Sequence, residues 1–193
     1  DICVKRLFDL LLALCAAVVL ALPVAVVAVA VRLTSPGPAL YWSDRVGRGN
    51  KIFKMPKFRS MRVGTPAVAT HLLADARSHL TPIGSFLRKS SLDELPQLWS
   101  ILVGDMSFVG PRPERPEFVA DLEQKLRYYA ERHMVKPGIT GWAQINYPYG
   151  ASIEDSRQKL EYDLYYIKHQ SIFLDLLIIF RTAKTVLFRK GSR

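Results

Sequence analysis

The chain has 193 residues, 49% of them hydrophobic, and its 27 Lys and Arg outnumber its 17 Asp and Glu to give a formal net charge of +10. This size predicts one compact catalytic unit with an appendage, and the charge predicts an anionic partner: nucleic acid, a phosphate-bearing substrate or an acidic membrane surface. Cys3 and Cys15 lie in or beside the apolar N-terminus, which argues against a disulfide pair or a cysteine metal site.

The first element is an apolar stretch of 22 residues without a charge, from Leu10 to Val31. As a helix it would cover roughly 33 Å, about one hydrocarbon thickness, so we expect it to enter a membrane. A cleavable signal peptide is disfavoured, because a strongly basic segment follows without a clear cleavage site.

Two features bear on whether this stretch crosses the bilayer. Pro23 lies near its middle and predicts a sharp bend. Basic residues flank both ends, with Lys5 and Arg6 before the stretch and Arg32 after it. Positive charge near membrane segments favours the cytoplasmic side, and here both flanks are positive. The residues alone leave two structures open, a re-entrant helix and a kinked spanning helix.

A turn at residues 35–38 ends the membrane element, and short extended stretches are expected at 39–42 and 51–54. The basic cluster at residues 57–62 follows, and taken alone such a cluster is more often a solvated face than a binding site. Helical patterns occupy residues 95–103, 116–133, 153–168 and 171–189. The last of these combines a broad apolar face with a basic fringe, which suits packing on the core or lying in the membrane interface.

Asp93 and Glu94 are the central candidates for chemistry. Ser91 and Glu94 also fit a capping box, which would start a helix without any chemistry. Pro96 belongs in a first helical turn, so a helix is expected to begin between Asp93 and Leu95, with both carboxylates at its N-terminus. Backbone N–H groups there keep a carboxylate ionised and favour a nearby phosphate. Adjacent acids suit two jobs, in which one attacks phosphorus and the other holds a divalent cation or orients a group.

Arg112 lies between Pro111 and Pro113, which fix the backbone and predict a preorganised guanidinium suited to bidentate phosphate binding. A surface salt bridge is the alternative. Further on, the run from Lys136 to Gln144 predicts a rigid turn, which contacts a base or sugar or is purely structural.

Several common catalytic signatures do not occur in the sequence: a P-loop, a dinucleotide glycine fingerprint, an Asp-x-Asp metal clamp and a serine nucleophile elbow. A retaining glycoside hydrolase is disfavoured as well. Its two carboxyls must lie about 5 Å apart on opposite sides of a sugar, which neighbouring residues rarely achieve.

Seven motifs run through nearly the whole chain: KRLFD (5–9), KFRSM (57–61), LDELPQL (92–98), GDMS (104–107), GPRP (110–113), KPGITG (136–141) and YDLYY (162–166). In this order they resemble the bacterial sugar transferase family, the monotopic polyprenyl-phosphate phosphoglycosyl transferases. The chain looks like the exopolysaccharide-linked branch.

The resemblance implies an α/β fold that is mostly helical with a small sheet. It implies a re-entrant membrane helix at residues 1–34 and a compact cytoplasmic catalytic domain with interfacial amphipathic helices at residues 35–193. The implied reaction transfers a sugar 1-phosphate from a UDP-sugar to polyprenyl phosphate, such as undecaprenyl phosphate, and releases UMP. It would initiate exopolysaccharide or other glycoconjugate synthesis at the cytoplasmic face of the bacterial inner membrane.

The resemblance also implies roles for the site residues. Asp93 would attack the sugar-bearing phosphate and form an aspartyl phosphosugar, which polyprenyl phosphate collects in a second, ping-pong step. Asp93 and Glu94 would hold Mg²⁺, and Glu94 would alternatively assist proton transfer. The expected substrate and phosphate contacts are Lys57, Arg59, Arg88, Arg112, Gln144 and Asp163. The expected partners are the UDP-sugar, polyprenyl phosphate and membrane lipids, with no nucleic acid and with room for a homodimer.

The sequence departs from the family pattern at two places. Leu22 precedes Pro23 where many relatives have serine, which keeps the bend but puts a serine contact with the backbone in doubt. Asn146, Tyr147 and Pro148 stand where many relatives read Asn-Gly-Arg, so a basic contact expected there is missing. The identity of the sugar stays open.

A rival from another class is a membrane-tethered basic scaffold that binds anionic lipid or nucleic acid. It explains the charge and the membrane segment, but it has no need for Asp93 or Glu94. It predicts salt-sensitive binding that is indifferent to an Asp93→Asn substitution.

Overall fold

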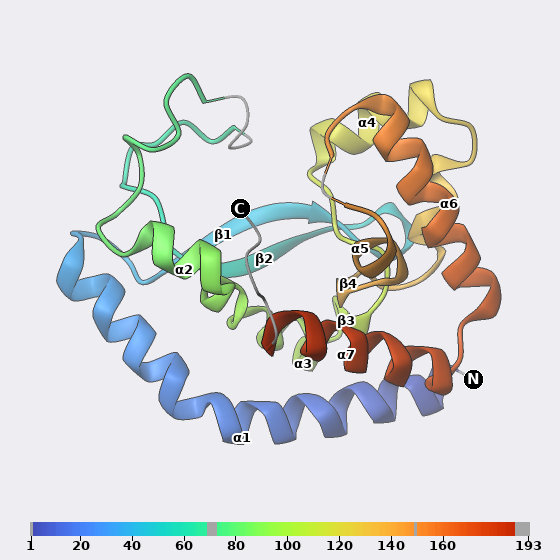
Figure 1. The fold of residues 1–193 in the computed structure, drawn as a ribbon, viewed down its shortest axis with the longest axis horizontal. Helices are drawn as coiled ribbons and strands as arrows, with labels where there is room; N and C mark the ends of the chain where they lie inside the picture. The colour runs from blue at the N-terminus through green and yellow to red at the C-terminus, as the bar shows by residue number, and fades with distance from the viewer. Residues whose placement is uncertain (1, 69–72, 149, 188–193) are drawn as a thin grey trace. The chain divides into compact units, whose positions relative to one another are not determined.

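A computed structural model describes residues 2–68, 73–148 and 150–187 (Figure 1). These residues are mostly helical, with two small sheets of two strands each, which confirms the predicted mixture. The chain divides into two compact units: unit 1 comprises residues 1–11, 44–54 and 101–193, and unit 2 comprises residues 12–43 and 55–100. The division at residue 34 into a membrane part and a catalytic part stays a prediction.

The first helix, α1 (Ile2–Thr34), is continuous over 33 residues with Pro23 inside it. Figure 1 shows that its axis is bent, as expected where a proline removes a backbone hydrogen bond. Among the described residues it is the one helix that is long and apolar enough to cross a membrane. Its apolar side chains are largely exposed, 79% for Val18 and 74% for Leu22, which suits contact with lipid.

The other helices and strands are β1 (Leu40–Val46), β2 (Ile52–Phe58), α2 (Gly84–Ser90), α3 (Gln97–Val103), β3 (Ser107–Val109), α4 (Pro116–Lys125), β4 (Gly138–Thr140), α5 (Trp142–Asn146), α6 (Ile153–His169) and α7 (Ile172–Leu187). The 3₁₀ turns η1 (Arg48–Asn50), η3 (Leu92–Glu94) and η4 (Tyr129–Met134) lie between them. Strands β1 and β2 pair in one sheet, and β3 and β4 pair in the other.

Several predicted elements are confirmed. The extended stretches at 39–42 and 51–54 correspond to β1 and β2, and the helix at 153–168 is α6. The last helix is α7, and its predicted residues 188 and 189 lie outside the described residues.

Other boundaries were wrong for local reasons. The helix expected at 116–133 is divided into α4 and η4, because the backbone is extended at Leu126, with φ −121° and ψ 119°, and left-handed at Tyr128, with φ +64°. The run 136–144, expected to be a turn, forms β4 and the start of α5. The helix expected at 95–103 begins only at Gln97.

The core of unit 2 forms where α1 packs on β2 and α2. Val27 and Val31 of α1 cluster with Phe58 of β2 and Leu87 of α2, and all four side chains are buried. Burying apolar side chains of this size is worth roughly 1.5–3 kcal/mol each, so the second half of α1 is a part of the folded core.

The N-terminus of α2 approaches the chain at Ser60 so closely that only glycine fits. A Cβ on Gly84 would stand 2.1 Å from the Ser60 carbonyl oxygen. The same oxygen accepts a hydrogen bond from the Thr81 amide at 3.0 Å. This approach fixes the start of α2 and, through the helix, the position of Arg88 in its last turn.

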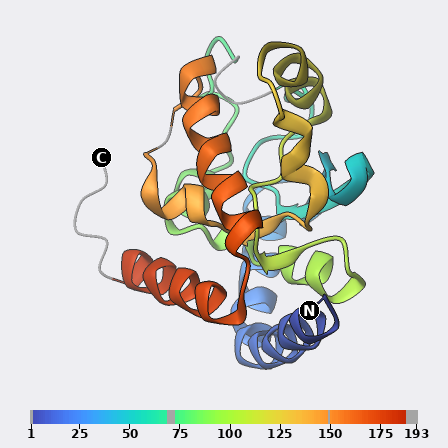
Figure 2. The ribbon, with the colours of Figure 1, turned by 90° about the vertical axis from the view of Figure 1, so that its right-hand side faces the viewer.

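Unit 1 is built around the parallel pair β3 and β4, in which Ser107 lies opposite Gly138 and Val109 lies opposite Thr140. Figure 2 shows α6 in orange and α7 in red meeting at an angle. Their buried side chains pack with β3 in one cluster of Val109, Tyr166 and Ile178.

Buried charges fasten the first turns of α1 to unit 1. Lys5 Nζ lies 2.5 Å from Asp175 Oδ2, and the Asp175 side chain is 0% exposed. The Tyr166 hydroxyl donates to the other oxygen of Asp175 at 2.7 Å. Asp9 accepts a hydrogen bond from Ser107 Oγ at 3.0 Å. In the sequence analysis, Lys5 served as a basic residue that favours the cytoplasmic side of a membrane. In the structure it also forms an internal ion pair.

Lys5→Met is expected to destabilise the protein strongly, because it leaves the Asp175 carboxylate buried without a cation. Removing one partner of a buried ion pair costs about 3–5 kcal/mol. Thermal unfolding in detergent should show this as a lower melting temperature. Adding Asp175→Leu should recover most of the loss, since an apolar pair needs no counter-ion. Equal losses in the single and double variants would contradict this assignment.

Candidate functional site

The acid pair lies in a short turn between α2 and α3, in unit 2. Ser91 ends α2 in a left-handed conformation with φ +58°, and its amide bonds back to the helix. The 3₁₀ turn η3 follows and carries Asp93 and Glu94. Ser91 makes no side-chain cap hydrogen bond, so the capping box does not form. The Asp93 side chain is turned inward and only 8% exposed, whereas Glu94 is half-buried.

Basic side chains from two other elements of unit 2 reach this turn. Lys57 Nζ, from β2, lies 3.1 Å from Glu94 Oε1. Arg88, from the last turn of α2, donates from Nε to Ser60 Oγ at 2.9 Å. Ser60 therefore positions Arg88, a role that no sequence pattern indicated. The structure thus brings together four predicted site residues: Lys57, Arg88, Asp93 and Glu94.

Burial is the largest influence on Asp93 and raises the pKa of its carboxyl above the usual value. The charge of Lys57 opposes this shift most strongly, Glu94 adds to it as a like charge, and Arg88 opposes it. Burial also lowers the pKa of Arg88, while Asp93 raises it. Asp93 is therefore a poorly hydrated carboxylate whose ionised form depends on neighbouring cations.

This arrangement suits nucleophilic attack on a phosphate ester. A carboxylate with little solvation is a stronger nucleophile than one in water, and nearby cations attract the phosphate that it attacks. Because Glu94 is paired with Lys57, the two adjacent acids differ in environment and can play different parts.

The carboxylate oxygens of Asp93 and Glu94 could supply part of the ligands of a Mg²⁺ ion. Mg²⁺ prefers oxygen ligands and is commonly held by one or two carboxylates together with substrate phosphates. Asp93 and Glu94 supply two carboxylates from one turn. In the described part of the chain, no group of three or more His, Cys, Asp or Glu could hold a metal ion. The remaining ligands would therefore come from the substrate and from water.

Arg59 is buried by contacts with the chain itself. Its guanidinium donates to the Ser35 carbonyl at 3.0 Å, to Ser35 Oγ at 2.8 Å and to the Pro38 carbonyl at 2.8 Å. It thereby ties the turn after α1 to the end of β2. A contact of Arg59 with substrate stays a prediction.

The other predicted contacts, Arg112, Gln144 and Asp163, belong to unit 1. Arg112 is exposed, Gln144 is half-buried in α5, and Asp163 is buried in α6. Asp163 accepts two hydrogen bonds from Arg132, which the sequence analysis did not single out. Their expected contacts with substrate stay predictions.

Trp142, the aromatic residue of the run 136–144, packs within unit 1. Its ring stacks on Tyr165 with a centroid distance of 5.8 Å, and the Arg181 guanidinium lies 5.7 Å from its centroid. These contacts support the structural alternative for this residue.

Comparisons with known proteins give the family and the relatives that the chain resembles. A family model described as "Bacterial sugar transferase" matches residues 1–189. The chain is 42% identical over 190 residues to the "UDP-N-acetylgalactosamine-undecaprenyl-phosphate N-acetylgalactosaminephosphotransferase" of Aeromonas hydrophila, covering 98% of this chain and 45% of that protein. It is 44% identical over 191 residues to the "UDP-glucose:undecaprenyl-phosphate glucose-1-phosphate transferase" of Xanthomonas campestris pv. campestris, covering 97% and 40%.

The chain thus spans less than half the length of these two relatives. A shorter relative matches over nearly its full length. It is the "Exopolysaccharide production protein PSS" of Rhizobium leguminosarum bv. phaseoli, 39% identical over 197 residues and covered to 98% in both chains.

The charges around Asp93 yield a test that needs no substrate. Lys57→Met is expected to raise the pKa of the Asp93 carboxyl further, because it removes the strongest opposing cation. Glu94→Gln is expected to lower it, because it removes a like charge. The ¹³C shift of the Asp93 carboxyl, followed against pH in detergent, measures both. Lys54→Met, which breaks an exposed ion pair with Asp44, is the control. Shifts in the same direction in both site variants would refute this account.

Proposed function

The chain belongs to the bacterial sugar transferase family, and we propose that it transfers a sugar 1-phosphate from a UDP-sugar to undecaprenyl phosphate. The products are undecaprenyl-diphosphate-sugar and UMP, and the reaction initiates exopolysaccharide or another glycoconjugate. The observation that carries this proposal is the buried carboxylate of Asp93 in a basic surrounding. The printed names of the two long relatives support the donor and acceptor classes.

The reaction runs in two displacements at one phosphorus atom. In the first, an Asp93 carboxylate oxygen bonds to the sugar-bearing phosphorus, and the bond to the bridging oxygen breaks. UMP leaves with the electron pair, and the phosphosugar stays on Asp93. In the second, an oxygen of undecaprenyl phosphate attacks the same phosphorus and releases the carboxylate. Because burial raises the Asp93 pKa, the first step slows as pH falls through that raised value.

The neighbouring residues of unit 2 support these steps. Lys57 keeps Asp93 ionised and holds Glu94 in place through their ion pair. Arg88, positioned by Ser60, attracts the diphosphate of the donor. Asp93 and Glu94 would hold Mg²⁺ together with that diphosphate, and the ion would neutralise charge on the leaving phosphate. For unit 1, binding of phosphate by Arg112 and of the nucleotide or sugar by Gln144 stay predictions.

The topology proposed for α1 is re-entrant, and contacts within unit 1 support it. Lys5, at the start of α1, binds Asp175, which follows α1 by more than a hundred residues. In the parts of the chain that the structure describes, no second helix between them could cross a membrane. Because Lys5 and Asp175 are in contact, they lie on the same side of a membrane. A helix that enters and returns at the Pro23 bend satisfies this constraint.

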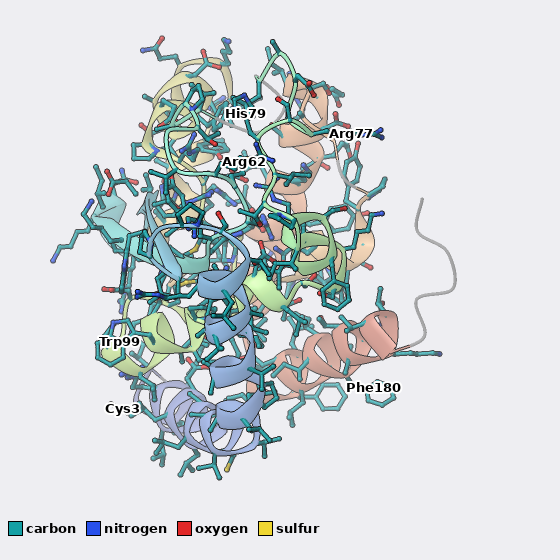
Figure 3. All side chains as sticks on the ribbon, turned by 90° about the vertical axis from the view of Figure 1, so that its left-hand side faces the viewer. Cys3, Arg62, Arg77, His79, Trp99 and Phe180 are labelled. Carbon is teal, nitrogen blue, oxygen red and sulfur yellow. The ribbon has the colours of Figure 1, made fainter. Side chains whose placement is uncertain are left out.

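Helix α7 is proposed to lie in the membrane interface. Phe173, Leu176 and Phe180 form an exposed apolar face at helical spacing, and Phe180 is 67% exposed. Figure 3 shows Phe180 projecting outward from its helix. Since basic flanks favour the cytoplasm, we place the catalytic residues at the cytoplasmic face of the inner membrane. A homodimer and the absence of a nucleic-acid partner stay predictions.

Asp93→Asn is expected to lower UMP release by about 10⁴-fold or more, because an amide cannot replace the carboxylate nucleophile. The assay uses detergent-solubilised protein, a panel of UDP-sugars, Mg²⁺ and undecaprenyl phosphate. Lys54→Met is the matched surface control. Equal activity of Asp93→Asn and the wild type would contradict the role of Asp93 as nucleophile. If the wild type bound membranes but released no UMP with any donor, the basic scaffold would be favoured.

The re-entrant topology predicts that both ends of α1 react with a membrane-impermeant maleimide from the same side. One variant keeps Cys3, which is exposed, and carries Cys15→Ala. A second carries Cys3→Ser, Cys15→Ala and Thr34→Cys. Labelling is compared in right-side-out and inside-out vesicles. Reaction of the two positions from opposite sides would establish a spanning helix instead.

A further inference from the structure

We propose that the buried ion pair of Arg132 and Asp163 positions Arg112 for phosphate binding, so that Arg132 and Asp163 are positioning residues of the reaction. This inference rests on the proposed function, because it takes the phosphate of the donor as the group that Arg112 binds. All the contacts that carry it lie within unit 1.

The backbone around Arg112 is held at four successive carbonyl oxygens. The Pro111 carbonyl accepts from the Gly138 amide at 2.9 Å, and the Glu114 carbonyl accepts from the Val46 amide at 3.0 Å. The two carbonyls between them accept from arginines: that of Arg112 from Arg132 at 2.9 Å, and that of Pro113 from Arg45 at 3.3 Å. Segments from β1, η4 and β4 therefore converge on one loop.

The loop presents a single exposed cation. The side chains of Pro111 and Pro113 are buried, whereas that of Arg112 is exposed. Both prolines also restrict the backbone on their own account. A fixed backbone and fixed flanking residues reduce the conformational entropy that the loop loses when Arg112 binds an anion. Such preorganisation is a common way in which a protein strengthens phosphate binding.

Arg132 is the central donor of this arrangement. Its side chain is 5% exposed, and it donates to Asp163 Oδ2 from Nε at 3.1 Å and from an Nη at 2.9 Å. Its other Nη donates to the Tyr129 hydroxyl at 3.2 Å. The Nη that binds Asp163 is also the one that binds the Arg112 carbonyl. Asp163, 3% exposed, thus aims Arg132 at the loop.

A positioning role can be separated from a stabilising role by a stability-matched variant. The double variant Arg132→Met with Asp163→Leu replaces the buried pair by apolar side chains of similar size, which commonly preserves stability. It removes the donor to the Arg112 carbonyl. We expect a melting temperature close to that of the wild type, with the KM for the UDP-sugar raised about tenfold and kcat changed less. Asp121→Asn, which breaks an exposed ion pair with Lys125, should change neither.

The decisive comparison repeats the double variant in an Arg112→Ala background. If the pair acts through Arg112, the tenfold effect on KM should shrink to less than about twofold there, because coupled residues are not additive. The same tenfold effect in both backgrounds would overturn the proposal. So would an unchanged KM in the double variant.

A second readout keeps this test separate from the proposed reaction. Amide hydrogen exchange at Val46 and Gly138, which hold the same loop, should quicken in the double variant and stay unchanged in Asp121→Asn. If the wild type released no UMP with any donor, the proposed function would fail, and exchange at these two amides would decide the positioning of the loop. Unchanged exchange at both would overturn it.

Discussion

Backbone carbonyls in irregular segments and in the last turn of a helix need donors from elsewhere, and in this protein arginine side chains supply several of them. Arg6 donates to the carbonyls of Ile101 and Leu102 at the end of α3. Arg45, Arg59 and Arg132 do the same for irregular segments elsewhere. A buried carbonyl without a donor costs about 1–3 kcal/mol, and a guanidinium with five N–H groups can satisfy several at once. The irregular segments that carry these carbonyls are therefore held in shape by arginine side chains.

This use of arginine changes the meaning of the net charge of +10. In the sequence, the excess of Lys and Arg over Asp and Glu predicts an anionic partner. In the structure, several of these cations make contacts within the protein instead. Lys5 neutralises Asp175, Lys57 pairs with Glu94, and Arg59 holds the turn at Ser35. Fewer cations than the net charge suggests are therefore available for a ligand, so the position of a cation tells more about function than the number of cations. The same distinction separates an enzyme from a basic scaffold, because a scaffold needs no buried carboxylate.

The sequence predicted the elements with strong local signals. The long apolar run, the amphipathic α6 and α7 and the acid pair were all recognised, because periodicity and motif spacing encode them directly. Features set by distant contacts were missed. Left-handed backbone occurs at Ser91, where α2 ends, and at Tyr128, where η4 begins, although neither residue is a glycine. The partners Ser60 and Arg132 lie 28 and 31 residues from Arg88 and Asp163, a separation at which no pattern indicates contact.

The ion pair of Lys5 and Asp175 joins residues 170 positions apart, and this separation has a consequence for synthesis. At roughly 5–20 residues per second, about 10–30 s pass between translation of the two residues. During this interval Lys5 has been made and its acidic partner has not, so the first turn of α1 cannot yet be locked in place. The apolar part of the helix is complete long before then. The closing of unit 1 at this ion pair therefore follows synthesis of the apolar part of α1, and α7 supplies the carboxylate that completes the attachment of the first turn of α1.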